Sequence, residues 1–425
     1  MNYINSSGFA HDLDLNDPLK HFREKFYFPQ MQGRDVIYFT GNSLGLQPKT
    51  TQDYVLNELE DWANFGVEGH FHARKPWMPY HEQFADPLAV LVGALPEEVV
   101  VMNQLTVNLH LLMVSFYRPN AKRFKILCEA RAFPSDQYAL ESQVKFHGFD
   151  PSEAILEVFP REGEHCLRTE DIQAAIDKNK DELALVLIGG VNYYTGQAFD
   201  MKAIAEAAHA AGSCVGFDLA HATGNIELQL HDWNVDFACW CSYKYLNSGP
   251  GSVAGVFIHT KHLGRNDIPR FAGWWGHDKA SRFRMEKGFV PIPTAEAWQM
   301  SNAPVFSMAA HKAAIDIFSE AGMVNLVKKS RKLTGFLEFI LDDINSKTKQ
   351  GAQKLEIITP RDEQQRGCQI SILAHGRGKE LFDKLTEAGV ISDWREPNVI
   401  RCAPVPLYNS YTDVFRFGQI LAQFC

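Results

Sequence analysis

The chain lacks any apolar run near the roughly 20 residues that a membrane-spanning helix needs. Its longest apolar stretch, residues 183–191, is interrupted by Gly189 and Gly190 and is typical of a buried strand. The opening residues, MNYINSSGFAHDLDLNDPL, have neither the basic start and apolar core of a secretory signal nor the acid-poor composition of a transit peptide. We therefore expect a cytoplasmic protein with no membrane partner.

The sequence also lacks a basic tract, and its 425 residues carry a net charge of −9. Proteins that bind nucleic acids neutralise backbone phosphates with clustered Lys and Arg. Neither a GxGxxG turn that opens a helix after a strand nor a GxxxxGK[ST] loop is present. These absences argue against a nucleic acid partner and against the common nucleotide-binding folds.

Cysteines are few and show no CxxC spacing that would indicate a zinc site or a redox pair. Cys239 and Cys241 flank Trp240 on an expected strand, so alternation directs both toward one face, where core packing is far more common than metal binding. Most of the others also lie in apolar segments. The pattern predicts buried free thiols in a reducing compartment, at positions 128, 166, 214, 239, 241, 368, 402 and 425.

Strand-like and helix-like segments alternate from about residue 98 to residue 258. Short, continuous apolar strands separated by helices are typical of a mainly parallel sheet that helices cover on both faces. We expect an α/β domain built on the strands VVVMN, FKILCEA, ILEVFP, LALVLIGG, CVGFD, DFACWCS and VAGVFIH.

The last third of the chain has a different pattern. Residues 304–344 show helical apolar spacing with a break near Gly322, and the rest alternates short strands with helices, as in a small α+β domain. By analogy with two-domain enzymes, the N-terminal segment, including the helix-like residues 49–64, should pack against this domain. We therefore expect three parts: an N-terminal segment 1–64, a large domain 65–303 and a small domain 304–425.

Three polar residues fall where expected strands end: Asp218 closes CVGFD, Lys244 follows DFACWCSY, and Asp136 follows FKILCEARAF. Ligands of an open parallel sheet bind beyond the carboxyl ends of its strands. A buried acid and a buried lysine are costly unless they are paired or hold a ligand. The set suits pyridoxal 5′-phosphate (PLP), which needs a lysine amine for its aldehyde, a carboxylate for its pyridine nitrogen and donors for its phosphate.

Other residues can complete such a site. Phe133 in AFPSD could stack on the ring, and Tyr243 offers a phenol to the phosphate. Leu105 and Thr106 open the helix LTVNLHLL, with Thr106 as a candidate N-cap, and helix N-termini attract phosphate. By spacing alone, plainer interpretations stay open. A lysine after a strand is often a solvated loop residue, an aspartate at a strand end is often a cap, and FPSD is often a plain turn.

Longer motifs make the pattern specific. The stretches IYFTGNSLGLQPK, LTVNLHLLM, ILCEARAFPSDQYALESQ, GFDLAHATGN, SYKYLNSGPG, GWWGH and IRCAPVPLYNS follow one another from about residue 37 to residue 410. In this order they resemble kynureninase. The resemblance implies the type I fold of PLP-dependent transferases and a homodimer with shared active sites. It also implies hydrolysis of L-kynurenine and 3-hydroxy-L-kynurenine to anthranilate or 3-hydroxyanthranilate plus L-alanine, in tryptophan degradation and NAD biosynthesis.

The resemblance also assigns roles around the cofactor. Lys244 would be the Schiff-base lysine and the base that moves the α-proton, Asp218 would hold the pyridine nitrogen, and His221 would tune that carboxylate. Tyr243 would reach the phosphate and is our candidate for relaying the late proton. The remaining cofactor contacts would come from Phe133 on the ring, Asp136 at its edge, and Leu105 and Thr106 at the phosphate.

For the substrate, the resemblance implies that Arg401 in VIRCAPV clamps the α-carboxylate. His70 and Asn302 match positions of animal-type members and favour 3-hydroxykynurenine, although His70 beside His72 also suits a plain surface histidine. Trp274 and Asn302 would close the site of the partner subunit. Ser43 could approach the substrate or serve as a helix N-cap.

Gly189 stands where many relatives carry serine, which predicts one missing polar contact near the phosphate and modestly weaker cofactor binding. A related PLP enzyme, a cysteine desulfurase, would need a nucleophilic cysteine on a mobile loop, whereas the best candidate, Cys368, begins an expected buried strand. A non-catalytic dimeric binding module should have lost Lys244 or Asp218, and both are present.

Overall fold

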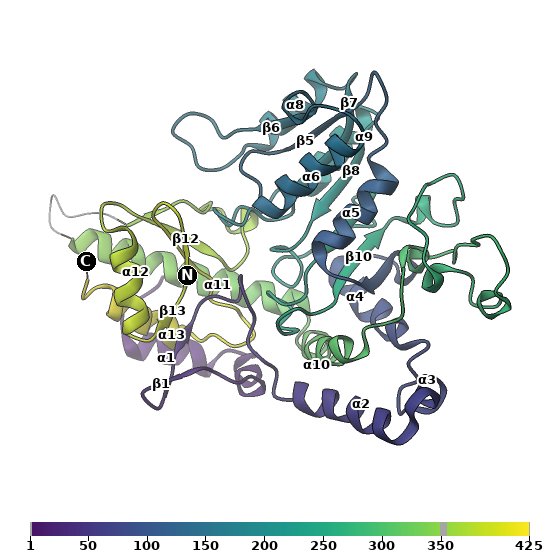
Figure 1. The fold of residues 1–425 in the computed structure, drawn as a ribbon. Helices are drawn as coiled ribbons and strands as arrows, with labels where there is room; N and C mark the ends of the chain where they lie inside the picture. Colours follow the sequence, from purple (N-terminus) through teal and green to yellow (C-terminus); the bar gives the residue numbers. More distant parts are fainter. Residues whose placement is uncertain (1, 349–354, 425) are drawn as a thin grey trace.

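The structure is a computed structural model that describes residues 2–348 and 355–424, so Cys425 lies outside the described residues. Within these two ranges, no helix is both long and apolar enough to cross a membrane. Two sheets dominate the fold, one in the middle of the chain and one near its C-terminus (Figure 1).

The larger sheet has seven strands in the order β4-β10-β9-β8-β7-β5-β6. Strands β5 to β9 are mutually parallel, whereas β10 runs antiparallel to both of its neighbours, β4 and β9. The mainly parallel sheet predicted from the strand pattern is therefore confirmed. Its strands are β4 (Val99–Met102), β5 (Lys125–Glu129), β6 (Ile155–Val158), β7 (Leu183–Gly189), β8 (Cys214–Asp218), β9 (Phe237–Trp240) and β10 (Ala254–Ile258).

Alternate residues of these strands enter two separate hydrophobic cores, one on each face of the sheet. On β9, Phe237 and Cys239 join one core, while Ala238 and Trp240 join the other. The helices that supply these cores are α4 (Ala85–Val92), α5 (Leu105–Phe116), α6 (Pro134–Phe146), α8 (Thr169–Lys178), α9 (Met201–Ala210) and α10 (Val305–Ala321). Helices thus cover both faces, as continuous apolar strands require.

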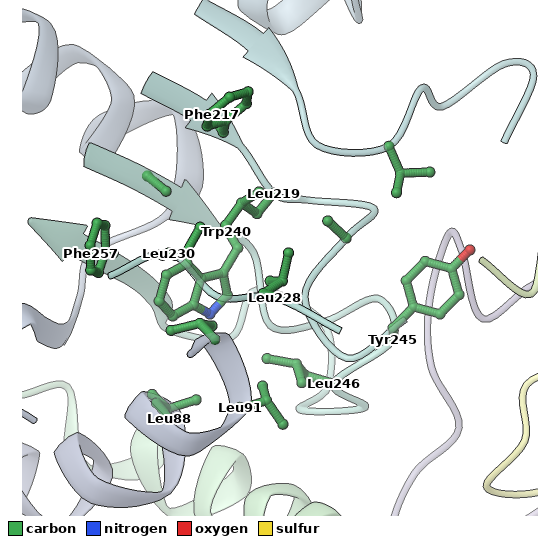
Figure 2. Close-up of a cluster of buried hydrophobic side chains, with 14 of the residues drawn as sticks. Leu88, Leu91, Phe217, Leu219, Leu228, Leu230, Trp240, Tyr245, Leu246 and Phe257 are labelled. Carbon is green, nitrogen blue, oxygen red and sulfur yellow. The ribbon is translucent and has the colours of Figure 1, made fainter. Parts of the chain in front are cut away.

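Trp240 anchors one of these cores, where it lies with Leu88, Leu91 and Phe257 (Figure 2). Gly255 on the neighbouring strand makes room for the indole, because a Cβ there would lie 2.2 Å from its ring atoms. This packing fixes the end of β9, directly before the segment that carries Lys244.

The second sheet is antiparallel, in the order β11-β12-β15-β14, and packs on α11 (Met323–Lys347), α12 (Gly378–Glu387) and α13 (Tyr411–Leu421). Gly322, with φ of +72°, separates α10 from α11 at the predicted break. The strands of this sheet are β11 (Leu355–Ile357), β12 (Ile370–Ala374), β14 (Asp393–Arg395) and β15 (Val399–Cys402).

The N-terminal segment joins both parts of the molecule. Strand β3 (Ile37–Tyr38) pairs with β13 (Val390–Ile391), and α1 (Ser7–Leu15) lies against α13, so purple and yellow elements adjoin in Figure 1. In contrast, α2 (Thr51–Phe65) packs along α10. The division into parts at residues 64 and 303 remains a prediction. Further short elements include α3 (Gly69–His72), α7 (Pro151–Ala154) and the hairpin of β1 (Gln30–Met31) and β2 (Arg34–Asp35).

Candidate active site

A cavity of about 190 Å³ lies where β5, β7, β8 and β9 end. Asp218 is the last residue of β8, and Lys244 follows β9 by four residues, so parallel pairing brings both to one edge. Eight residues of the predicted cofactor site line this cavity together with Gly189, namely Leu105, Thr106, Phe133, Asp136, Asp218, His221, Tyr243 and Lys244.

Lys244 is buried, and its Nζ lies 3.0 Å from Nε2 of His221. Burial, followed by the positive charge of Lys244, holds the pKa of His221 well below its usual range. The imidazole is therefore neutral, and its Nε2 can accept a hydrogen bond from the ammonium. The aromatic rings of Phe133 and Tyr243 lie 5.7 Å and 5.9 Å from the same nitrogen.

Three carboxyl groups, Glu129, Asp136 and Asp218, crowd the cavity around this single ammonium. Burial raises the pKa of each, to about 7 for Glu129, and the neighbouring acids raise that of Asp136 further. Backbone amides partly offset the cost of burying these carboxylates, because Ala220 donates to Asp218 at 2.7 Å and Gly189 donates to Glu129 at 3.2 Å. A bound cation would relieve the excess of acidic groups.

Aromatic side chains form the wall of the cavity. Phe133 is 41% exposed, and its ring meets Tyr193 edge to face at 5.2 Å. A flat ligand could therefore stack on Phe133 without displacing a packed core residue.

The N-terminus of α5 also borders the cavity. The N-cap is Gln104, whose side chain makes no capping hydrogen bond, so the prediction of Thr106 as N-cap is wrong. Thr106 instead stands within the first turn, and its hydroxyl bonds Ser135 at 2.8 Å. First-turn amides have no acceptor within the helix, so these residues offer donors to an anion.

Arg401 lies next to this cavity without lining it. Its guanidinium is fully buried, forms an ion pair with Asp393 at 2.8 Å and donates to the carbonyl of Tyr193 at 2.6 Å. Since Tyr193 does line the cavity, a single residue separates the guanidinium from the ligand space. An incoming carboxylate would compete with Asp393 for the guanidinium.

The other predicted substrate contacts do not line the cavity. Ser43 lies in a turn closed by Thr40, so the N-cap interpretation is wrong, since the next helix begins at Thr51. His70 on α3 is half-buried beside Trp77, with ring centroids 5.4 Å apart.

Trp274 and Asn302 both reach the surface. Trp274 is 42% exposed and its indole donates to the carbonyl of Arg282. Asn302 borders a second cavity of about 190 Å³ that shares Gln104 with the first. The functional roles predicted for these residues remain predictions.

At Gly189 an added Cβ would lie 3.0 Å from Oε1 of Glu129, and its next neighbours would be the carbonyls of Val191 and Asp218. A serine side chain there would meet the buried acid. The predicted loss of a contact near the phosphate stays a prediction.

Sequence reasoning missed Glu129, Ser135 and Tyr193, which also line the cavity. Glu129 carried a usable signal, because it ends the strand KILCE as Asp218 ends CVGFD. Tyr193 gave no such signal, since it lies in the irregular segment after β7.

No cysteine is among the residues that line the cavity, so the described structure gives no nucleophilic thiol there. Cys368 is fully buried before β12, and burial raises the pKa of its thiol to about 12. Of the cysteines in the described ranges, Cys166 and Cys214 are half-buried and the rest are buried, which confirms the expected free thiols there. The arrangement suits a flat aromatic cation with an anionic arm, held beside a lysine amine.

Comparison with known proteins gives specific matches. Residues 326–421 match a family model described as the kynureninase C-terminal domain. Kynureninase of Flavobacterium psychrophilum is 58% identical over 421 residues, covering 99% of this chain and 98% of the relative. Kynureninase of Myxococcus xanthus is 56% identical, with 99% and 97% covered, and that of Nematostella vectensis is 49% identical, with 98% and 94% covered.

Solved structures share the fold at low sequence identity. A cysteine desulfurase of Thermococcus onnurineus aligns with a TM-score of 0.74 at 16% identity, covering 100% of this chain and 99% of the other. The cystine C–S lyase C-DES, in complex with cysteine persulfide, aligns with a TM-score of 0.76 at 15% identity, covering 91% and 97%. A mutant of C-DES, with glycine covalently linked to its PLP cofactor, aligns with a TM-score of 0.74 at 15% identity, covering 91% of this chain and 96% of the other.

Proposed function

The chain belongs to the kynureninase family, and from this premise we propose that it binds PLP at Lys244 and hydrolyses kynurenines. L-Kynurenine would give anthranilate and L-alanine, and 3-hydroxy-L-kynurenine would give 3-hydroxyanthranilate and L-alanine. The observation that carries the proposal is the single cavity in which Lys244, Asp218 and Phe133 meet. The type I fold, seen in the similar PLP-dependent enzymes, supports the same cofactor.

The donor set fits PLP feature by feature. Lys244 offers an amine for the aldehyde, Phe133 a face for the pyridine ring, and the amides at the start of α5 an anion site for the phosphate. When bound, the cofactor supplies an electron sink for the carbanion that the reaction requires.

Asp218 would hold the pyridine nitrogen in its protonated form. Its carboxylate is buried at the strand end and oriented by the Ala220 amide, so its position is fixed before a ligand binds. Asp136 and Glu129 would stay protonated beside a single ionised Asp218, because adjacent buried carboxyl groups resist joint ionisation. Asp136 would then donate a hydrogen bond at the edge of the ring.

Lys244 would remove the α-proton of the substrate once its amine is free. Neutral His221, 3.0 Å away, can orient that amine and accept its hydrogen bond. Water then adds to the side-chain carbonyl, the bond between the β and γ carbons breaks, and the aryl carboxylate leaves. The remaining β-carbon needs a proton before alanine can form. Tyr243 would supply it, because burial raises the pKa of its phenol and keeps it protonated.

The α-carboxylate of the substrate would be held by Arg401. The bidentate geometry of a guanidinium suits a carboxylate, and Asp393 occupies it in this structure. Substrate binding would therefore exchange one carboxylate partner for another. His70 and Asn302 would approach the aromatic ring of the substrate, with a preference for 3-hydroxykynurenine, and Ser43 would also approach the substrate.

A homodimer would bring the remaining residues to the cavity. Trp274, Asn302 and His70 lie outside it within one chain. The surface of α2, α3 and α10, with the turn between α2 and α3, also exposes large apolar side chains, more than scattered residues of a monomer would explain. They are Leu56, Leu59, Trp62, Phe65, Val67, Phe71 and Phe306. We propose that a second copy covers this face and that each protomer supplies Trp274 and Asn302 to its partner's site.

We further propose a cytoplasmic enzyme of tryptophan degradation that also supplies NAD biosynthesis. The buried free thiols suit a reducing compartment. The predicted parts 1–64, 65–303 and 304–425 would let the sheet that carries Arg401 move relative to the cofactor cavity.

The test is product formation by purified protein supplied with PLP. Ultraviolet absorbance and fluorescence should reveal 3-hydroxyanthranilate and anthranilate, with alanine measured in parallel. Lys244→Ala should form neither product, while Lys180→Ala, at an exposed position, should resemble the native chain. A native protein that binds PLP and consumes neither kynurenine would overturn the proposed reaction.

A further inference from the structure

The chain segment after β7 is held by side chains of the C-terminal sheet, the sheet of β11, β12, β15 and β14. This segment carries Tyr193, which lines the cavity of the candidate active site. Three successive backbone carbonyls of the segment each accept a hydrogen bond from a side chain in or near β11 and β12. The pairs are Gln369 to Tyr193 at 3.0 Å, Ser371 to Tyr194 at 2.6 Å and Thr359 to Thr195 at 2.5 Å. One wall of the cavity is therefore attached to the C-terminal sheet.

Two of these donors share a face of the sheet with Arg401. Ser371 on β12 pairs with Arg401 on β15, and Arg401 pairs with Asp393 on β14. Residues that lie directly opposite each other on neighbouring strands point to the same face, so these three side chains form a polar row across the sheet. Gln369 lies two residues before Ser371 and points to the same face. The side chains that hold the Tyr193 segment are thus neighbours of the proposed substrate arginine.

The carbonyl of Tyr193 has two donors that differ in one respect. It accepts from Nη1 of Arg401 at 2.6 Å and from Nε2 of Gln369 at 3.0 Å. Arg401 is the residue that would hold the α-carboxylate of the substrate, so its donors would have to turn to a new acceptor. Gln369 is neutral and does not line the cavity, so an arriving carboxylate leaves its hydrogen bond in place.

The amide of Gln369 is buried and fixed in one orientation. Ser371 donates its only hydroxyl proton to the carbonyl of Tyr194, so its Oγ can only accept from Nε2 of Gln369, 3.0 Å away. Both N–H groups of the amide are therefore used. Its oxygen accepts from Nδ2 of Asn42 at 2.9 Å. These bonds fix the nitrogen of the amide on the side of the Tyr193 carbonyl.

Asn42 belongs to the turn of residues 41–45, which contacts the segment that carries Lys244. The Gly45 amide donates to the carbonyl of Tyr243 at 2.8 Å. A Cβ at Gly45 would lie 2.4 Å from the carbonyl oxygen of Lys244, so a glycine is needed for this close approach. Through Asn42, Gln369 therefore connects the lysine side of the cavity with the Tyr193 wall.

The position of Tyr193 affects how a ligand would be held. Its backbone lies between the guanidinium of Arg401 and the ligand space, and its ring meets Phe133 edge to face at 5.2 Å. Without Gln369, the Tyr193 carbonyl would depend on Arg401 alone. A substrate carboxylate that takes Arg401 would then leave this carbonyl without a side-chain donor, and an unpaired carbonyl in a buried place costs free energy.

We propose that Gln369 is a positioning residue, which holds the Tyr193 carbonyl in place while Arg401 changes its partner to the substrate carboxylate. The inference rests on the proposed function, because it takes the role of Arg401 from there. Loss of the Gln369 donor should weaken the binding of an α-amino acid. Binding of PLP alone should change little, because Arg401 still holds Tyr193 when no carboxylate is bound.

The test is binding of L-alanine, the expected amino acid product, to the PLP-loaded protein, followed through the absorbance of the bound cofactor. Gln369→Met removes the donor at similar side-chain length and should raise the dissociation constant of alanine about 10-fold, as loss of one hydrogen bond does. Its dissociation constant for PLP should stay within ~2-fold of native. The matched control is Gln365→Met, at an exposed position, which should bind alanine like the native protein.

Gln369→Glu gives a second readout and decides the question if Gln369→Met does not fold. A protonated carboxyl group can donate to the Tyr193 carbonyl, whereas an ionised one cannot. Relative to native, the alanine affinity of this variant should therefore fall as the pH rises from 6 to 8.5. The charged groups of the same face, Arg401 and Asp393, are common to both proteins.

The outcomes separate this inference from the proposed reaction. A native protein that binds alanine but consumes neither kynurenine would overturn the reaction and leave the alanine measurements to decide the role of Gln369. The role is wrong if the native protein binds no alanine, or if Gln369→Met binds alanine as tightly as native. It is also wrong if that variant loses PLP affinity in the same proportion, or if the relative affinity of Gln369→Glu does not change with pH.

Discussion

Lys244 and His221 face each other across 3.0 Å, and the imidazole is buried and neutral. A neutral acceptor beside the amine orients it without adding charge, whereas a carboxylate at the same distance would bind the ammonium more strongly. Three acids do lie in the cavity, yet burial raises the pKa of each. The site thus has one lysine amine and a set of carboxyl groups poised for different protonation states.

Asp218→Asn should lower the rate of kynurenine hydrolysis at least ~10²-fold, because an amide cannot stabilise a protonated pyridine nitrogen. Steady-state kinetics with saturating PLP measures the effect. Asp200→Asn is the matched control, since it preserves the N-cap of α9 and lies outside the cavity. A rate within a few-fold of native for Asp218→Asn would contradict the role of this carboxylate.

Tyr243→Phe should slow alanine formation by about 10- to 10²-fold, because the phenol that would protonate the β-carbon is removed. Rapid-quench measurement of a single turnover separates release of the aryl product from formation of alanine. Tyr245→Phe, two residues further on and outside the cavity, is the control. Unchanged single-turnover chemistry in Tyr243→Phe would reject the proton relay.

Glu129 should make the stability of the cofactor-free protein depend on pH. Burial raises its pKa from 4.5 to about 7, so the native state holds the proton more tightly than the unfolded chain does. Its contribution to stability is complete below about pH 4.5 and is lost as the pH rises to about 7. Glu129→Gln cannot ionise, and at pH 8 it should be more stable than the native protein by about 3 kcal/mol.

Urea unfolding at pH 5 and pH 8 measures this difference. Glu157→Gln, at an exposed position of the next strand, is the matched control for loss of a carboxylate. The prediction fails if Glu129→Gln and the native protein lose stability equally between the two pH values.

Mixed dimers should test whether the active sites are shared. Lys244→Ala and Trp274→Ala, each nearly inactive alone, should regain up to about a quarter of native activity after joint unfolding and refolding, since half of the random dimers would hold one intact site. Mixing Lys244→Ala with Asp218→Asn is the control. Both residues line the cavity of one chain, so every site of a mixed dimer carries a defect and activity should not return. Recovered activity in this mixture would show that unfolding and refolding alone restore it. If Trp274→Ala is as active as native alone, the partner contribution is wrong.

Cys368→Ala should leave kynurenine hydrolysis within ~2-fold of native and lower stability by about 1 kcal/mol, as loss of a small buried side chain does. The thiol is fully buried and far from ionisation, so it cannot act as the nucleophile of a desulfurase. Sulfide release from L-cysteine, measured on both proteins, provides the comparison. Cysteine-dependent release that disappears in the variant would contradict this assignment.

Most of the fold could be predicted because the apolar residues of strands and helices follow patterns that are visible within a few residues of sequence. The continuous apolar strands from VVVMN to VAGVFIH indicated a sheet with two covered faces, and the structure confirms it. Local capping was less predictable. Thr106 was expected to cap α5, yet Gln104 holds that position, because the preceding backbone sets the helix start and the side-chain type only favours it.

The candidate site divides in the same way. Asp218 could be found because it ends a parallel strand, and Lys244 because it follows the next one by a few residues. The motifs AFPSD and SYKYLN added Phe133 and Tyr243. The ion pair of Arg401 with Asp393 could not be found, since it depends on the antiparallel register of β14 and β15.

By itself, the sequence determined the order of strands and helices, the candidate residues of the site and the family resemblance, because each depends on residues close together along the chain. Only the tertiary structure decided which distant residues meet, such as Glu129 with Gly189, β3 with β13, and Gln369 with Tyr193. The physical reason is that strand order and packing bring these pairs together, and neither is encoded in a local pattern.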